Sequence, residues 1–252
     1  MKVALLLAVI ASAAAFAPSS RLPSARPASV EVSETKDDLV TLAKDLNPVV
    51  KFYDPTGLSD QRFWESTNEQ TIGFLRHAEI KHGRIAMFAF IGFIVSANQI
   101  TWPWPMTMAG DPFPKAASAP AAWDALPDLA KIQIILFVGF LEYWSEANME
   151  KHYMRGGRPG DFPDFDAKKV PGGSLNLYDP FNWTRDLPQE SKDKRLLAEI
   201  NNGRLAMLGI MGFVSESSVE GSVPFLKGII PHYDGEVMAP LTKSIIKVYG
   251  IL

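Results

Sequence analysis

Two short stretches of the chain carry side chains that can bind a metal. Glu79 and His82 lie three residues apart, and Glu199 and Asn202 repeat that spacing later in the chain. Residues three apart share one face of a helix. A carboxylate, an imidazole and an amide oxygen can each bind a hard cation such as magnesium. A single such pair is most simply a helix cap or an interfacial polar residue, but its recurrence favours ligation.

These residues belong to an internal repeat. Residues 78–95 read AEIKHGRIAMFAFIGFIV and residues 198–215 read AEINNGRLAMLGIMGFVS, with nine identities in eighteen aligned positions. A Tyr-Asp-Pro sequence precedes each copy, at 53–55 and at 178–180. Each repeat unit is therefore interpreted as an Asp-Pro turn, a linker and a helix.

The apolar second half of each copy, at 85–97 and 205–214, is shorter than the ~20 residues that a membrane-spanning helix needs. A longer helix would draw the charged first half of each copy toward the membrane, where each charge costs roughly 2.5–3.5 kcal/mol. A symmetric crossed pair of the two helices would pair these charges. We therefore predict contacts of Glu79 with Arg204 and of Glu199 with Arg84.

Small residues at the same place in each copy would let the two backbones approach closely; they are Gly83 and Ala86 in one and Gly203 and Ala206 in the other. A third apolar segment, 132–144, lies between the copies. The expected fold is an all-α membrane protein of three transmembrane helices, at about 71–97, 128–150 and 191–216. The first and third form the pseudo-symmetric crossed pair. On hydropathy alone, a soluble three-helix bundle remains an alternative.

The connections predict an orientation. Residues 98–131 hold two Lys or Arg residues and residues 147–198 hold nine, so the second connection and the mature N-terminus are expected on the stromal side and the first connection in the lumen. Tryptophans in the first connection suit a membrane interface. Its prolines predict that it contains no helix. The residues concerned are Trp102, Trp104, Trp123, Pro103, Pro105, Pro112, Pro114 and Pro120.

The N-terminal residues have the composition of targeting segments. Residues 1–15 run from a lysine through an apolar stretch to small residues, as in a signal peptide, and residues 16–30 are rich in Ser, Pro, Ala and Arg, as in a transit peptide. The junction at Ala15-Phe16 resembles the bipartite presequence of algae with complex plastids. The folded domain is therefore expected within 31–252. A secreted protein with a propeptide is the alternative.

Composition excludes several classes of function. The net charge of −3 offers no basic field for nucleic acid. The absence of cysteine excludes a disulfide framework, a thiolate metal site and a cysteine nucleophile. Any metal must be held by nitrogen or oxygen.

The paired motif, EIKHGRIAM at 79–87 and EINNGRLAM at 199–207, resembles the chlorophyll a/b and a/c light-harvesting superfamily. The resemblance extends from about residue 53 to residue 216. It implies that axial ligands of chlorophyll magnesium are supplied by Glu79, His82, Glu199 and Asn202, and by Glu142 of the middle helix, and that Arg84 and Arg204 form interhelix ion pairs. It offers Gln133, Glu216 and His232 as further candidates. The chain departs from green-plant members at Ser145, where they carry an arginine that pairs with the middle-helix glutamate.

The resemblance implies a light-harvesting antenna in a plastid thylakoid membrane, not an enzyme. Its presequence favours the branch that binds chlorophyll a, chlorophyll c and fucoxanthin or a related xanthophyll. The expected partners are a photosystem core, neighbouring antenna proteins and membrane lipid. One alternative is a photoprotective member of the family that senses pH through lumenal acids such as Asp111, Asp124, Asp128 and Asp234. A remote alternative is a membrane di-iron carboxylate oxidase, which would need a second Glu-x-x-His where this chain has Glu199 and Asn202.

Overall fold

The computed structural model describes residues 35–165, 179, 181, 183, 187–237, 239 and 241. The predicted signal and transit peptides lie outside the described residues, as do Tyr178 and Pro180 of the second Tyr-Asp-Pro sequence. Within the described part the regular structure is helical and includes no β-strand, in agreement with the expected all-α class.

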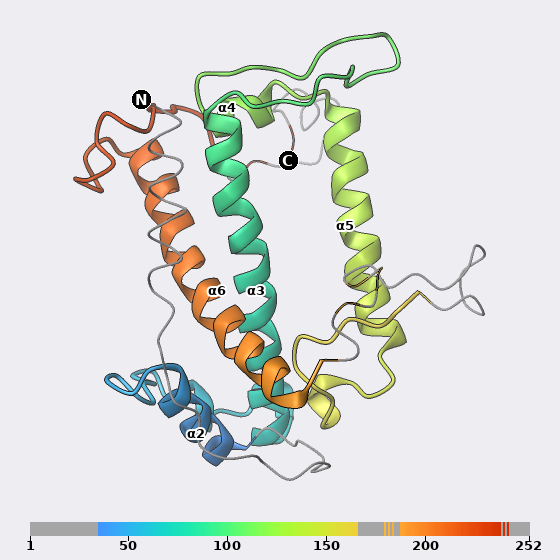
Figure 1. The fold of residues 1–252 in the computed structure, drawn as a ribbon, viewed down its shortest axis with the longest axis vertical. Coiled ribbons are helices and arrows are strands. Elements are labelled where there is room, and N and C mark those ends of the chain that lie inside the picture. The colour runs from blue at the N-terminus through green and yellow to red at the C-terminus, as the bar shows by residue number, and fades with distance from the viewer. Residues whose placement is uncertain are drawn as a thin grey trace. The chain divides into compact units, whose positions relative to one another are not determined.

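Figure 1 labels the helices. The α-helices are α2 (Lys36–Leu46), α3 (Asn68–Ala97), α4 (Ala119–Asp124), α5 (Asp128–Asn148) and α6 (Gln189–Ser218), with short 3₁₀ helices at Leu58–Asp60, Phe63–Glu65 and Tyr153–Arg155. Helices α3, α5 and α6 correspond to the three predicted segments, with ends within three residues of those expected.

Capping residues explain where two helices begin. The hydroxyl of Thr67 accepts the backbone N–H of Gln70, and the Gln70 side chain accepts the backbone N–H of Thr67, so α3 begins at Asn68. The side chains of Thr35 and Asp38 form the same reciprocal cap before α2. Sequence analysis did not predict α2, although a threonine followed three residues later by an acid was visible.

The prediction that the first connection contains no helix is wrong. Helix α4 begins after Ser118, whose hydroxyl accepts the backbone N–H of Ala121. Pro120 lies in the first turn of α4, where a backbone N–H has no helical partner and proline is tolerated. The earlier prolines of this connection, at 103, 105, 112 and 114, lie in non-helical chain.

The chain divides into two compact units, and α3, α5 and α6 each contribute residues to both. The described part of the first unit comprises 85–141 and the chain from 205 onward. In it Phe213 of α6 stacks on Phe90 of α3 with ring centroids 4.8 Å apart. The hydroxyl of Tyr233 donates a hydrogen bond to the carboxylate of Asp124, which ties the segment after α6 to the end of α4. This bond raises the pKa of Tyr233 to about 12.

The second unit contains described residues up to Arg84 and within 142–204. Its small apolar core consists of Leu46 of α2, Ile80 of α3 and Ile200 of α6, each about 4% exposed. The amide of Asn201 donates to the backbone carbonyl of Leu46 at 3.3 Å. Helix α2 is therefore held against the first halves of α3 and α6.

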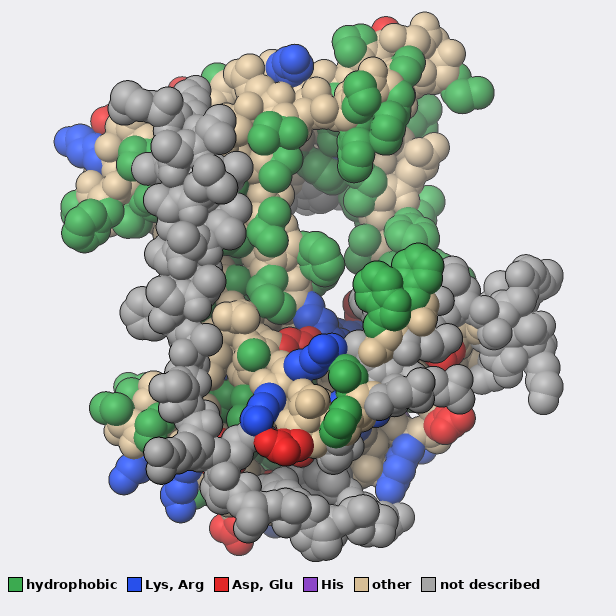
Figure 2. Space-filling model, viewed as in Figure 1, with side chains coloured by type: hydrophobic (Ala, Val, Ile, Leu, Met, Phe, Trp, Pro, Cys, Tyr) green, Lys and Arg blue, Asp and Glu red, His purple; other side chains and the backbone are tan. Residues whose placement is uncertain are grey.

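Large apolar side chains are exposed along the helices, most densely on α5. Figure 2 shows hydrophobic side chains exposed along the helices. Among the described helices, α3 alone has the length and composition of a membrane span under a limit of two charged residues in 18. Every 18-residue stretch of α5 exceeds that limit, because it holds Lys131 and Glu142 together with Asp128 or Glu146.

Candidate functional site

Helices α3 and α6 meet at two glycines in the second unit. A Cβ atom built on Gly83 would lie 3.0 Å from the Cα atom of Gly203, and one built on Gly203 would lie 2.9 Å from the Cα atom of Gly83. Real Cβ contacts are almost never so short, so only glycine fits at both positions without a shift of the backbone. The helix axes can therefore approach closely enough for side chains on either side of the glycines to pair.

Two ion pairs join the helices at this contact. The Nε atom of Arg84 lies 2.5 Å from an Oε atom of Glu199, and the Nε atom of Arg204 lies 2.7 Å from an Oε atom of Glu79. These are the two pairs that the repeat predicts. Each glutamate therefore carries its charge beside a cation from the other helix.

The two pairs differ in their additional partners, which sequence analysis missed. The second carboxylate oxygen of Glu79 accepts a hydrogen bond of 2.6 Å from Arg76, one turn earlier on α3. Within the described part of the chain, Arg84 is the only cation paired with Glu199. Arg84 also donates to the backbone carbonyl of Gly160 at 2.5 Å. The repeat could not reveal Arg76, because a leucine stands at the equivalent place in the second copy.

His82 is exposed, and its geometry leaves one ring nitrogen free to ligate. Its Nδ1 atom lies 2.8 Å from the backbone carbonyl of Ala78. A carbonyl only accepts, so Nδ1 carries the proton and Nε2 keeps its lone pair. A hydrogen bond of this kind orients a metal-binding histidine. The amide of Asn202 is also exposed and makes no hydrogen bond within the described residues, so its oxygen is available.

Glu142 of α5 has a partner that sequence analysis did not predict. The Nζ atom of Lys81 on α3 lies 2.6 Å from a carboxylate oxygen of Glu142. The same Nζ atom reaches the hydroxyl of Ser145 at 3.2 Å and Glu146 at 3.4 Å. The sequence signal for this contact is the difference between Lys81 and its counterpart Asn201, because the two copies face different neighbours.

The remaining candidates have different surroundings. Both carboxylate oxygens of Glu216 accept backbone N–H groups, from Gly221 at 2.9 Å and Val223 at 2.8 Å, and the side chain is 1% exposed. His232 places Nδ1 3.0 Å from the Ser217 carbonyl and Nε2 2.6 Å from a carboxylate oxygen of Asp234, so both ring nitrogens already have partners within the protein. Glu216 and His232 therefore act in chain packing here. Gln133 is exposed on α5.

A pocket of about 320 Å³ lies beside the ion pair of Glu79 and Arg204, within the second unit. Glu79, Arg76 and Arg204 form its charged side, and apolar residues of α2 and the chain after it form the opposite wall, including Leu39, Leu42, Leu46, Val50 and Phe52. A ligand in this pocket would meet Glu79 together with its two arginine partners, and aliphatic side chains elsewhere.

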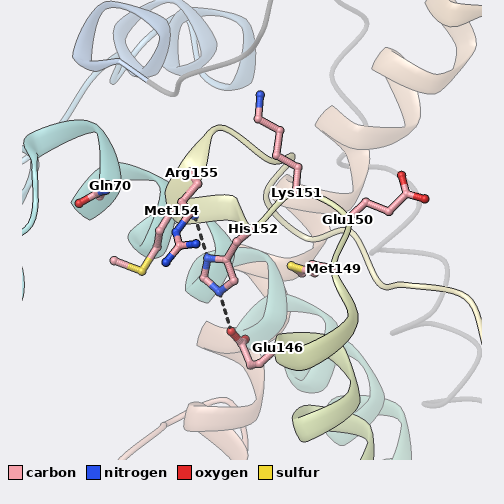
Figure 3. Close-up of a pocket in the computed structure, with 8 residues that line it drawn as sticks. All are labelled: Gln70, Glu146, Met149, Glu150, Lys151, His152, Met154 and Arg155. Carbon is pink, nitrogen blue, oxygen red and sulfur yellow. Dashed lines mark hydrogen bonds and ion pairs between the residues drawn. The ribbon is translucent and has the colours of Figure 1, made fainter. Parts of the chain in front are cut away.

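A second pocket, of about 600 Å³, lies around the end of α5 (Figure 3). The ring of His152 lies between the carboxylate of Glu146, 3.0 Å from Nε2, and the backbone N–H of Met154, 3.2 Å from Nδ1. Tyr153 stacks on the buried ring of His77 with centroids 3.9 Å apart and donates to Glu146. Burial and the negative charge of Glu146 raise the pKa of Tyr153 to about 12. The phenol therefore remains a hydrogen-bond donor.

The turns before the two repeat helices share a hydrogen bond. An oxygen of Asp54 accepts the backbone N–H of Leu58 at 3.1 Å, and an oxygen of Asp179 accepts that of Trp183 at 2.7 Å, four residues on in each case. Asp54 also accepts the backbone N–H of Ser59 at 2.8 Å, and this hydrogen bond lowers the pKa of Asp54 to about 2. The acid thus stays ionised and holds its turn at neutral pH.

Comparison with known proteins decides the family. The profile of the chlorophyll A-B binding protein family matches residues 38–218, which contain the crossing glycines, both ion pairs and every proposed ligand on α3, α5 and α6. The chain belongs to this family. Its members are light-harvesting membrane proteins and not enzymes.

Named relatives match over most of their length. The chain is 33% identical over 229 residues to the fucoxanthin-chlorophyll a-c binding protein of Trieres chinensis, with 90% of this chain and 98% of the relative covered. It is 31% identical to fucoxanthin-chlorophyll a-c binding protein F of Phaeodactylum tricornutum, with 85% and 94% covered. It is also 31% identical to protein A of the same name from Macrocystis pyrifera, with 82% and 88% covered. All three names describe chloroplastic proteins.

Proposed function

We propose that this chain is a light-harvesting antenna protein that holds chlorophyll a, chlorophyll c and fucoxanthin in a plastid thylakoid membrane and passes excitation energy to a photosystem. Family membership and the names of the relatives support the pigments and the plastid. The observation that carries the proposal is the pair of glutamates, Glu79 and Glu199, each held by an arginine of the other repeat.

The donor set fits chlorophyll. The macrocycle fills four positions around magnesium and leaves an axial position for one side chain, and magnesium accepts oxygen and nitrogen ligands. The proposed axial ligands are Glu79, His82, Glu142, Glu199 and Asn202, with Gln133 as a further candidate. The bound pigments supply the light absorption. The side chains set the position and orientation of each ring, and the arginines neutralise the carboxylates that would otherwise carry charge into lipid.

We also propose that α3, α5 and α6 each cross the membrane and that α3 and α6 form the pseudo-symmetric pair. The shared Asp turns, the facing glycines and the reciprocal ion pairs support the symmetry. Charge pairing supports the spans of α5 and α6, because Glu142, Glu199 and Arg204 each lie beside an opposite charge. On this proposal the expected partners are a photosystem core, neighbouring antenna proteins and lipid.

Pigment analysis of the purified native protein tests the proposal. Extraction should give chlorophyll a, chlorophyll c and fucoxanthin, and excitation of fucoxanthin should produce chlorophyll a fluorescence. A protein that purifies without pigment would contradict the antenna function. In protein refolded with the same pigments, His82→Leu should lose about one chlorophyll, because leucine removes the free Nε2 atom. An unchanged count would remove His82 from the ligand set.

A further inference from the structure

The two repeat copies differ at a position beside their shared motif. Lys81 in the first copy is replaced by Asn201 in the second, although the flanking isoleucine, glycine and arginine are the same in both copies. Asn201 donates its amide to the carbonyl of Leu46, whereas Lys81 contacts the carboxylate of Glu142. Each residue thus suits the element that its own helix faces: a neutral carbonyl of α2, or an acidic turn of α5.

The surroundings of Glu142 make an unpaired negative charge unfavourable there. Its side chain is 57% exposed, on a helix whose exposed side chains include Tyr143, Phe140 and Phe137. An ionised carboxylate on such a surface is costly in lipid unless a cation is beside it. Lys81, at 2.6 Å, is the cation that the described residues place there.

The other acid near Lys81 has partners of its own. Glu146 accepts hydrogen bonds from the Nε2 atom of His152 at 3.0 Å and from the hydroxyl of Tyr153 at 3.2 Å, and its distance to Lys81 is 3.4 Å. The backbone N–H bonded to Nδ1 of His152 requires that Nε2 carries the proton. His77 faces the same carboxylate with its Nε2 atom 4.0 Å away. Neutral donors therefore serve Glu146, and the charge of Lys81 is directed mainly at Glu142.

Ser145 makes room for this arrangement. Its side chain is 1% exposed; the hydroxyl bonds to the backbone carbonyl of Glu142 at 2.9 Å and lies 3.2 Å from the Nζ atom of Lys81. A long side chain at this buried position would compete with Lys81 for the same space. The cation for Glu142 thus comes from a different helix and not from its own next turn.

We propose that Lys81 is the positioning residue of a chlorophyll site on α5: its ammonium neutralises Glu142, so that this carboxylate can serve as an axial magnesium ligand within the membrane. The inference rests on the proposed antenna function. The magnesium macrocycle is neutral, so a carboxylate ligand leaves one negative charge on the complex, and Lys81 cancels it. Lys81 also ties the α5 ligand to α3 and so constrains the distance between the pigments on these helices.

The test uses the full chain refolded with chlorophyll a, chlorophyll c and fucoxanthin. Lys81→Met keeps the length of the side chain and removes its charge, and it should lose about one chlorophyll with one matching band in the difference absorption spectrum. Lys81→Arg should keep that pigment, because it restores the charge. Lys194→Met is the matched control, since Lys194 forms an exposed ion pair of 2.7 Å with Glu190 and neither residue is a proposed ligand, and it should lose none.

A second background separates charge neutralisation from packing. Glu142→Gln offers a neutral amide oxygen that needs no cation, so Lys81→Met added to Glu142→Gln should cause no further pigment loss. Loss of the same pigment in both backgrounds would show a packing role and overturn the proposal. Retention of all chlorophyll by Lys81→Met, while Glu142→Leu loses one, would overturn the role of Lys81 and leave the α5 site standing. Retention by both variants would overturn the α5 site as well.

Discussion

At the scale of single residues, the repeat predicts the partners that join its two copies and not those that each copy finds elsewhere. The contacts of Arg84 with Glu199 and of Arg204 with Glu79 follow from symmetry and from the cost of charge in a membrane. Arg76 and Lys81 have no counterpart in the second copy, so the repeat does not predict their partners. Their roles depend on which element packs against them, and the tertiary structure decides that.

Within the described chain Glu79 has two arginine partners and Glu199 has one, so we predict that loss of an arginine destabilises the protein by different amounts at the two sites. Arg84→Leu should lower the stability of the pigment-loaded protein more than Arg204→Leu, because Glu79 retains Arg76 whereas Glu199 retains no cation among the described residues. Leaving a charged group without its partner costs about 1–3 kcal/mol or more, so Arg84→Leu should show a cost in that range and Arg204→Leu a smaller one. The temperature at which each variant loses energy transfer between its pigments measures the stability of both variants.

Removal of the extra cation provides the control. In a protein that already carries Arg76→Leu, the two arginine substitutions should become similar in effect, because each then strands one glutamate. Equal losses for Arg84→Leu and Arg204→Leu with Arg76 intact would contradict the asymmetry seen in the hydrogen bonds of Glu79.

At the scale of helices, sequence patterns predict the long elements well and the capped ends less well. The apolar runs locate α3, α5 and α6 because burial or lipid contact requires them. Helix α4 was missed because prolines were treated alike, although Pro120 occupies a first turn, where its ring is tolerated. Helix α2 was missed because its charged sequence shows no long apolar run, and its stability depends on docking through Leu46.

The contact between α3 and α6 predicts opposite effects for two glycines of one helix. Gly83→Ala would place a Cβ atom 3.0 Å from the backbone of Gly203, so it should destabilise the pigment-loaded protein by about 1–3 kcal/mol. Gly92, on the same helix, has nothing within 4 Å of an added Cβ atom. Gly92→Ala should be neutral or stabilise by up to about 1 kcal/mol, because alanine is the better helix former.

Thermal unfolding followed by chlorophyll circular dichroism distinguishes these variants. Helix content of the two proteins should remain the same, so that any difference reports the helix contact. Equal stability of Gly83→Ala and Gly92→Ala would mean that the helices do not approach at Gly83 as closely as described.

At the scale of the whole molecule, the pairing of opposite charges explains how a sequence with many charged residues can lie in a membrane. Mean hydropathy is near zero, and only α3 among the described helices passes a composition test for spanning. Several acidic and basic groups of α5 and α6 are paired, as for Lys131 of α5, which is 1% exposed, contacts Asp128 at 3.6 Å and donates to the carbonyl of Asp124. Composition tests count charges singly and so cannot register this neutralisation.

The asymmetry of charge between the two connections predicts how the chain is oriented. Nine Lys or Arg residues in 147–198 against two in 98–131 place the second connection in the stroma and the first in the lumen. The chain has no cysteine, so a single introduced thiol reports one site. In sealed thylakoids with the stromal face outward, Glu150→Cys should react at once with a membrane-impermeant maleimide. Met108→Cys, fully exposed in the first connection, should react only after the membrane is opened.

The opposite labelling pattern would reverse the orientation while leaving three crossings intact. Labelling of both thiols in sealed membranes would place both connections on one side and require an even number of crossings between them, which α5 as a single span does not allow. The same pair of variants therefore tests the orientation and the spanning role of α5, the helix whose charges depend on Lys81 and Lys131 for their partners.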